Sequence, residues 1–195
     1  MPNHLTTDSI LLALPVIVLS VAIGILIKLD SKGPIIFRQR RMGYRGEIFS
    51  MYKFRTMRPR AEVVDETSAR ADAMTQSDDD RITRIGRFLR RTRIDELPQM
   101  VNILRGEMSW IGPRPEAVPL SQWYEGEIPF YSYRHIIRPG ISGWAQVHQG
   151  HVTDLESIHK KLSYDFYYVK YFSAWIDIVI ALRTISTMIG GFGAK

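Results

Sequence analysis

The sequence predicts an α+β fold: a mostly helical single domain that contains a small antiparallel β-hairpin and begins with an apolar helix. Three observations support this prediction. The 195 residues suit one compact domain. Residues 10–27 form one apolar run, whereas residues 33–57 contain two short apolar runs separated by turn glycines. Several later segments place apolar residues three or four positions apart, which is typical of helices.

The apolar run at residues 10–27 is about as long as the shortest membrane-spanning helices, which need roughly 17 residues. It is interrupted only by Pro15, Ser20 and Gly24 and has no polar stripe, although a buried core helix is the alternative. A signal peptide is a poor interpretation, because no Lys or Arg precedes the run and no small-residue cleavage site follows it. Pro15 removes one helical hydrogen bond and favours a kink, so the residues leave open whether the segment spans a membrane or enters and returns. The basic flank that follows predicts that the rest of the chain is cytoplasmic.

The later elements follow from local patterns. Residues 35–37 and 48–54 are the apolar runs of the predicted hairpin, with Gly43 and Gly46 between them. The polar, acidic segment 57–80 is expected to be a mobile loop. Helices are expected at residues 81–91, 97–104, 155–171 and 174–189, and Pro- and Gly-rich loops at residues 111–115 and 138–143.

Composition and charge limit the chemistry. The chain has no cysteine, which excludes disulfides, thiolate nucleophiles and Cys-ligated zinc. The net charge of +6 favours an anionic partner: a nucleic acid, a nucleotide phosphate or an anionic membrane face. Residues 81–93 contain six arginines and no acid, and an acidic pair follows directly. A charge run alone is usually a solvated surface, but this combination is harder to explain that way.

The acidic pair, Asp95 and Glu96, is predicted to lie at the N-terminus of the helix 97–104. Helix capping is the simpler explanation of such a pair. However, carboxylates, arginines and a helix N-terminus together can bind a metal–diphosphate, with the acids on the metal and the cations on phosphate oxygens. Mg²⁺ is the expected ion, because it favours one or two carboxylates plus substrate phosphate. A carboxylate can also attack phosphorus and form an acyl phosphate.

Further cations are candidate phosphate ligands. Arg114 stands between two prolines, and Arg138 begins an Arg-Pro-Gly turn, so both side chains have restricted backbones; a plain turn is the alternative. Lys53 and Arg55 are two positions apart in the second predicted strand and should share one face. The histidines show no metal-ligand spacing.

Seven ordered stretches together resemble the bacterial sugar transferase family, the monotopic phosphoglycosyl transferases. They are residues 30–39 (Asp-Ser-Lys-Gly-Pro, then Phe-Arg-Gln), 52–57 (Tyr-Lys-Phe-Arg-Thr-Met), 93–99 (Arg-Ile-Asp-Glu-Leu-Pro-Gln), 106–115 (ending in Gly-Pro-Arg-Pro), 138–143, 145–147 (Ala-Gln-Val) and 164–168 (Tyr-Asp-Phe-Tyr-Tyr). Two features depart from the family pattern. No Lys or Arg precedes Pro15, and the stretch from His148 to His151 replaces an arginine that many members carry.

The resemblance implies a transfer reaction in the first membrane step of exopolysaccharide, O-antigen or glycan assembly. Asp95 would attack the β-phosphorus of a UDP-sugar, release UMP and hold a covalent phosphosugar, which undecaprenyl phosphate would accept. Glu96 would assist as metal neighbour or base, and Mg²⁺ would lie between Asp95 and the diphosphate. Lys53, Arg90, Arg114 and Asp165 match family positions associated with the site. Together with Arg55 and Arg138, they are the candidate residues for binding the substrate phosphates or the nucleotide.

The resemblance also implies the organisation of the chain. Residues 1–29 would form a re-entrant membrane helix broken near Pro15, and residues 30–195 a catalytic domain on the cytoplasmic face of the bacterial inner membrane. The partners would be UDP-sugar, undecaprenyl phosphate and membrane lipid. A homodimer is compatible with the resemblance, and nucleic acid is not an expected partner. The competing interpretations are a binding module for nucleic acid or membrane surfaces and an inactive scaffold. The absence of a nucleic-acid-binding signature and the intact acid pair argue against both.

Overall fold

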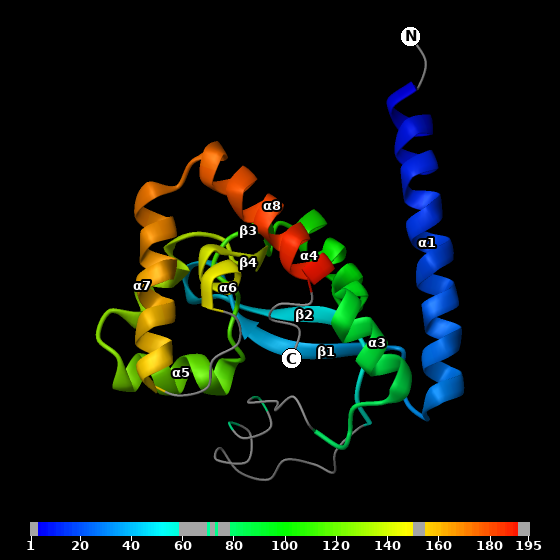
Figure 1. Ribbon diagram of the computed structural model, residues 1–195, viewed down its shortest axis with the longest axis horizontal. Helices are drawn as coiled ribbons and strands as arrows, with labels where there is room; N and C mark the ends of the chain where they lie inside the picture. Colours follow the sequence, from blue (N-terminus) through cyan, green and yellow to red (C-terminus); the bar gives the residue numbers. More distant parts are fainter. Residues whose placement is uncertain (1–3, 59–69, 71–72, 74–78, 150–154, 191–195) are drawn as a thin grey trace.

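The computed structural model describes residues 4–58, 70, 73, 79–149 and 155–190, and its described part is mostly helical with two small sheets (Figure 1). The elements, in chain order, are α1 (His4–Asp30), β1 (Ile36–Met42), η1 (Tyr44–Gly46), β2 (Ile48–Phe54), α3 (Arg84–Thr92), η2 (Ile94–Gln99), α4 (Met100–Leu104), β3 (Ser109–Ile111), α5 (Val118–Glu127), η3 (Tyr131–Ile136), β4 (Gly140–Ser142), α6 (Trp144–Gln149), α7 (Leu155–Tyr171) and α8 (Ala174–Gly190). This composition confirms the predicted α+β class.

The predicted hairpin is confirmed. Strands β1 and β2 pair antiparallel, from Ile36 opposite Phe54 to Met42 opposite Ile48. Because side chains alternate along a strand, the hairpin has two distinct faces. One face places Phe54 against α1 and α3, and the other places Met51 against Met108 after α4. The hairpin is therefore the layer on which the helices of the site are assembled.

Helix α1 joins the domain through its C-terminal part. Ile23 and Ile27 are buried in a cluster with Phe54 of β2 and Leu89 of α3. At the end of α1, the Asp30 carboxylate accepts a hydrogen bond from the backbone N–H of Ile85 at 3.1 Å, which ties α1 to the start of α3. The N-terminal part of α1 extends beyond the rest of the domain (Figure 1).

The expected break near Pro15 is not present. α1 is one helix from His4 to Asp30 with Pro15 inside it. A proline removes one donor and favours a bend, but neighbouring turns can continue the helix on both sides. Among the described residues, no helix combines the length and apolar character needed to cross a membrane.

Helix α3 confirms the predicted helical segment 81–91 and is fixed at both ends. The Thr83 hydroxyl accepts a hydrogen bond from the N–H of Gly86 at 2.9 Å, which is an ordinary N-cap. A Cβ on Gly86 would lie 2.0 Å from the carbonyl oxygen of Thr56, so only glycine permits this approach of α3 to the end of the hairpin. At the other end, Arg93 adopts the left-handed conformation (φ 56°, ψ 15°) and turns the chain into η2.

The second sheet was not predicted. β3 and β4 are three-residue parallel strands that pair Ser109 with Gly140 and Ile111 with Ser142. They bring together the two Pro- and Gly-rich segments that the sequence shows only as separate loops. The contact requires glycine, because a Cβ on Gly140 would lie 2.1 Å from the backbone nitrogen of Gly112.

The remaining predictions have mixed outcomes. α7 has the predicted bounds, and α8 ends one residue later than predicted. The helix predicted at 97–104 is instead a 3₁₀ segment, η2, followed by the five-residue α4. The helical elements α5, η3 and α6 were not predicted. Most of the expected loop at 57–80 lies outside the described residues.

Candidate active site

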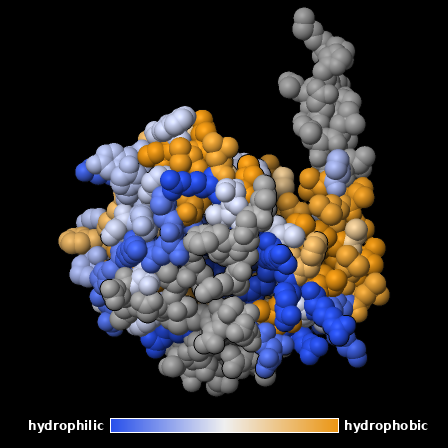
Figure 2. All heavy atoms as spheres, viewed as in Figure 1, coloured by the Kyte–Doolittle hydropathy of each residue, from blue (hydrophilic) through white to orange (hydrophobic). Residues whose placement is uncertain are grey.

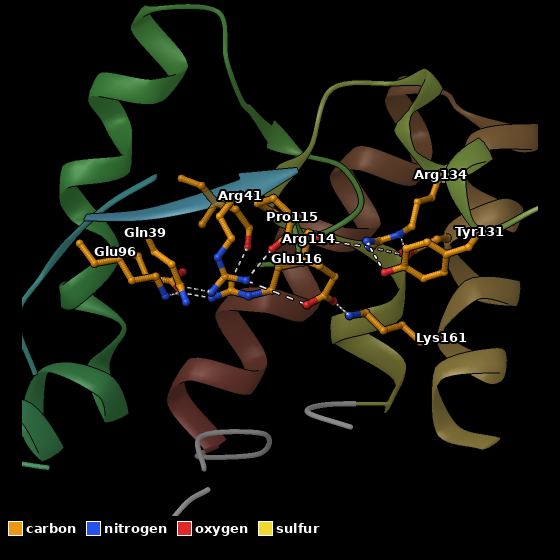
Figure 3. A network of polar contacts seen from close by, with 12 residues as sticks. Gln39, Arg41, Glu96, Arg114, Pro115, Glu116, Tyr131, Arg134 and Lys161 are labelled. Carbon is orange, nitrogen blue, oxygen red and sulfur yellow. Dashed lines mark hydrogen bonds and ion pairs between the residues drawn. The ribbon is translucent and has the colours of Figure 1, made fainter. Parts of the chain in front are cut away.

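The candidate active site is a cluster of acids and cations from three elements. The Glu96 carboxylate oxygen Oε1 lies 3.0 Å from Lys53 Nζ of β2 and 2.6 Å from Arg114 Nη2 of the loop after β3. Asp95 Oδ2 lies 4.0 Å from the same Lys53 nitrogen. Both acids are only 7% exposed. Figure 3 shows Glu96 and Arg114 within a wider network of polar contacts.

Asn102 of α4 fixes the acids beside Lys53. Its side chain is fully buried and makes three hydrogen bonds. The amide oxygen accepts from the N–H of Tyr52 at 3.1 Å, while the amide nitrogen donates to the Ser50 carbonyl at 2.8 Å and to Glu107 at 2.7 Å. These bonds hold α4, and hence η2, against strand β2.

The two acids have opposite electrostatic environments. Burial raises the pKa of Asp95, and the negative charge of Glu96 adds to this effect against the opposing Lys53, Arg114 and Arg90. Burial would also raise the pKa of Glu96, but Arg114 and Lys53 hold it well below the ordinary value. Glu96 is therefore a fixed counter-ion for two cations. Among the described residues, the one cation paired with Asp95 is Lys53, whose Nζ lies 4.0 Å from Asp95 Oδ2.

The short 3₁₀ start of η2 changes one expectation about this site. The sequence predicted that the N-terminus of an eight-residue helix would contribute to anion binding. Because η2 and α4 are short and different in geometry, the positive potential at the acids comes mainly from side chains. Arg90 of α3 belongs to this group, since its charge lowers the pKa of Asp95.

Three predicted site residues lie elsewhere. Arg55 and Lys53 were expected on one face, but β2 ends at Phe54, so the strand alternation does not reach Arg55. The buried Arg55 guanidinium donates instead to the carbonyls of Ser31 and Lys32, both at 2.7 Å, at the C-terminal end of α1. Arg138 is exposed and donates to the Gly106 carbonyl at 3.0 Å.

Asp165 is the third. It is 1% exposed and accepts hydrogen bonds from Nε and Nη2 of Arg134, at 2.9 and 2.7 Å. A side chain with this burial and this partner does not present itself to a substrate. The structure therefore places Asp165 in a buried ion pair with Arg134.

The structure adds charged residues that sequence patterns did not indicate. Arg41 of β1 donates to Gln39 Oε1 at 2.6 Å and to the Pro115 carbonyl at 2.8 Å, and it lies 4.0 Å from Glu116 (Figure 3). Burial lowers the pKa of Arg41 to about 10, although Glu116 opposes this effect. Glu116 is also paired with Lys161 of α7. The only sequence signal was that Gln39 and Arg41 are two positions apart in a strand, and therefore share a face.

The stretch that replaces a family arginine has a defined environment. His148 Nδ1 lies 2.7 Å from the carbonyl oxygen of Trp144, and its Nε2 contacts Nη1 of Arg183 from α8. His148 is therefore in contact with a guanidinium from α8.

The acid pair is compatible with a divalent cation. Within the described part of the chain, no group of three or more acidic, His or Cys side chains could hold a metal ion. Two carboxylates are nevertheless the protein ligands that Mg²⁺ commonly uses, with phosphate oxygens and water completing the shell. Within the part of the chain that the structure describes, no cation lies closer than 4.0 Å to Asp95, so Asp95 is the better placed of the two for such a ligand.

Comparisons with known proteins identify the family of this chain. The family profile described as "Bacterial sugar transferase" matches residues 5–191, so the chain belongs to the bacterial sugar transferase family. It is 48% identical over 177 residues to a UDP-N-acetylgalactosamine-undecaprenyl-phosphate N-acetylgalactosaminephosphotransferase of Aeromonas hydrophila. It is 43% identical over 176 residues to a UDP-glucose:undecaprenyl-phosphate glucose-1-phosphate transferase of Xanthomonas campestris pv. campestris.

The coverage of these relatives is unequal. The matched regions are 91% and 89% of this chain but only 40% and 35% of the two relatives. A third relative, "Exopolysaccharide production protein PSS" of Rhizobium leguminosarum bv. phaseoli, is 41% identical over 84% of this chain and 82% of its own length.

Proposed function

We propose that this chain transfers a phosphosugar from a UDP-sugar to undecaprenyl phosphate. In the first step, a carboxylate oxygen of Asp95 attacks the β-phosphorus. The bond from that phosphorus to the bridging oxygen breaks, and UMP leaves with the oxygen and its electron pair. In the second step, a phosphate oxygen of undecaprenyl phosphate attacks the same phosphorus. Asp95 then leaves as a carboxylate, and undecaprenyl-diphosphate-sugar is the product.

The observation that supports this proposal most strongly is the unequal environment of the two acids. A nucleophilic carboxylate must be available, and Asp95 is the acid whose oxygens are not held by a short ion pair. Burial raises the free energy of the Asp95 carboxylate anion. Attack on phosphorus converts this anion into an acyl phosphate and so removes the buried charge from the carboxylate. Glu96 has a lowered pKa and is a poor general base, so we assign it the role of holding Lys53 and Arg114 in place.

The cations of the cluster bind and orient the substrate. Arg114 is fixed between two prolines and by its contact with Glu96, and Lys53 extends from a regular strand. Fixed cations stabilise the charge that develops on phosphate oxygens, and they need no reorganisation during the reaction. Asp95 and Glu96 would hold Mg²⁺, which when bound supplies further neutralisation of the diphosphate.

We also propose that the chain works at the cytoplasmic face of the bacterial inner membrane. Figure 2 shows hydrophobic side chains over α1 and at α8, and exposed examples are Ile17, Val21 and Leu29 of α1 and Trp175 and Leu182 of α8. Contiguous exposed apolar surface of this kind is typical of contacts with membranes or partner proteins. An acceptor that carries a lipid requires access to the membrane.

The proposed topology is re-entrant, with both ends of α1 on the cytoplasmic side. This topology requires α1 to bend in the membrane, although the helix is continuous from His4 to Asp30 in this structure. The test is a cysteine introduced at Asn3, treated with a membrane-impermeant thiol reagent. Re-entry predicts that the cysteine reacts only after cell lysis. Labelling in intact cells would establish a spanning helix and overturn re-entry, but it would leave the chemistry of the acid pair untouched.

The decisive experiment for the transfer reaction uses the purified full chain, Mg²⁺ and a panel of UDP-sugars without undecaprenyl phosphate. We expect one equivalent of UMP and a mass increase equal to the phosphosugar, located on the peptide that contains Asp95. Adding undecaprenyl phosphate should discharge this adduct. UMP release that requires undecaprenyl phosphate and never shows an adduct would replace the covalent route with direct transfer. No UMP from any UDP-sugar, with or without the acceptor, would remove the proposed function.

A further inference from the structure

We propose that helix α7 sets the position of Arg114 through two ion pairs, one made by Asp165 with Arg134 and the other by Lys161 with Glu116. Asp165 is then a positioning residue that acts on the reaction through Arg114 and never touches the substrate. The inference deepens the proposed function, because it concerns the cation that contacts the acid pair.

The first contact reaches the backbone of Arg114. Arg134 of η3 is 2% exposed, and its Nη2 donates to the Arg114 carbonyl oxygen at 2.9 Å. The same guanidinium donates to Asp165 of α7 through Nε and Nη2, and its Nη1 donates to the Tyr131 hydroxyl at 3.1 Å. All three nitrogens of the Arg134 guanidinium are therefore engaged, so its direction is fixed on both sides. These contacts are labelled or drawn in Figure 3.

The second contact holds the chain two residues later. Lys161 Nζ pairs with Oε1 of Glu116, and Oε2 of Glu116 lies 4.0 Å from Arg41. Burial would raise the pKa of Glu116, but Lys161, Arg134 and Arg41 lower it to about 2. Glu116 is therefore ionised at neutral pH, and the loop that carries Arg114 is held by charge at both Arg114 and Glu116.

Both contacts come from one face of α7. Lys161 and Asp165 are four residues apart, so they lie on adjacent turns. The helix itself is anchored, because Ile158 and Leu162 are buried in the core cluster with Ala117 directly after the loop. α7 and the Arg114 loop are thus joined by both apolar packing and ion pairs.

Displacement of this loop would move the guanidinium of Arg114. Its Nη2 meets Glu96 at 2.6 Å, while its Nη1 donates to the Ile141 carbonyl at 3.1 Å. Prolines on both sides of Arg114 limit how far the backbone can adjust locally. A shift of about 1 Å in a positioning group can reduce turnover about 10²-fold. Loss of either ion pair between α7 and the Arg114 loop is therefore expected to lower kcat.

The test is a double-mutant cycle on UMP release. Asp165→Asn preserves shape and one acceptor but removes the counter-charge of Arg134, and it should lower kcat roughly 10- to 100-fold. Arg114→Ala lowers turnover by itself. If Asp165 acts through Arg114, then Asp165→Asn should change the turnover of Arg114→Ala by less than about threefold. An equal factor in both backgrounds, or unchanged turnover of the folded single variant, would overturn the proposal.

Tyr168→Phe is the matched control. It removes another hydrogen bond of α7, the one from the Tyr168 hydroxyl to Asp177 at 2.7 Å, which joins α7 to α8 and not to the Arg114 loop. We expect its kcat to change less than about twofold. Lys161→Met tests the second contact and serves in the cycle if Asp165→Asn does not fold.

Hydrogen exchange separates this proposal from the proposed function. The peptide covering residues 109–117 should exchange faster in Asp165→Asn or Lys161→Met, but not in Tyr168→Phe. If the wild-type chain released no UMP from any UDP-sugar, the proposed function would fail. The exchange measurement would still show whether α7 restrains the loop that carries Arg114. Unchanged exchange of that peptide in both α7 variants would show that α7 does not hold the loop.

Discussion

Replacing Asp95 by Asn should abolish turnover and yet make the protein more stable. Asn has nearly the same shape but no charge, so it removes the attacking oxygen anion and also the cost of burying that anion. The loss of turnover should be about 10³-fold or more, as expected for a covalent nucleophile. The gain in stability follows from the raised pKa of Asp95, which burial causes and Glu96 reinforces.

The magnitude follows from linkage. A carboxyl whose pKa is higher in the folded state favours folding when protonated and loses that contribution as the pH rises through the folded pKa. Each pKa unit of difference corresponds to about 1.4 kcal/mol at a pH above both values. A gain on the order of 1 kcal/mol at pH 7 would raise the melting temperature by about 2–4 °C for a protein of this size.

The assay is thermal unfolding of wild-type and Asp95→Asn protein across pH, together with UMP release. The stability difference should be present at pH 7 and disappear below the ordinary Asp pKa of 3.8, where the wild-type carboxyl is neutral in both states. A variant less stable than wild type at pH 7 would mean that the attraction between Lys53 and the Asp95 carboxylate outweighs the cost of burying that charge. Near-normal UMP release would refute the nucleophile assignment.

Three other changes probe neighbouring parts of the molecule. Glu96→Gln leaves Lys53 and Arg114 without their shared counter-ion, and it should cost about 3 kcal/mol of stability and at least about 10²-fold in kcat, measured by denaturant unfolding and UMP release; unchanged stability would contradict the ion-pair geometry. Arg55→Ala should lose about 2–3 kcal/mol because the carbonyls at the end of α1 lose their donors, while the KM for UDP-sugar stays the same; a raised KM at unchanged stability would restore a substrate role. Chelation with EDTA should abolish UMP release, and Mg²⁺ should restore it; full activity after exhaustive chelation would mean that the cations alone neutralise the diphosphate.

Elements with a long regular pattern could be predicted from the sequence, whereas elements made by distant contacts could not. The spacing of apolar residues predicted α3, α7 and the β1–β2 hairpin. Strands β3 and β4 are three residues each and have no periodicity, because their pairing depends on glycines that permit close backbone contact. Pro15 illustrates a different limit, since the family resemblance implied a break near it and the structure has one continuous helix there.

The same limit applies to charged residues. Lys53, Glu96 and Arg114 stand in recognisable motifs, and the structure brings them into contact. Arg134 stands in no motif, and its partner Asp165 is 31 residues away, so nothing local indicates the pair. Asp165 stands in the motif at residues 164–168, but its pairing with Arg134 is specified by the fold and not by any local pattern.

The acid pair shows why the site needs structure to be understood. Asp95 and Glu96 are adjacent and chemically alike, so a pattern of residues gives them the same properties. The turn at Arg93 and the short η2 direct them differently, and only Glu96 reaches both Lys53 and Arg114. Two cations on one acid leave the other acid with an unfavourable charge, and that difference supports assigning Asp95 as nucleophile. Moving either cation would reduce the difference between the electrostatic environments of the two acids. Helix α7 does not touch the acids, but it is connected to Arg114, and we therefore propose that it contributes to the reaction.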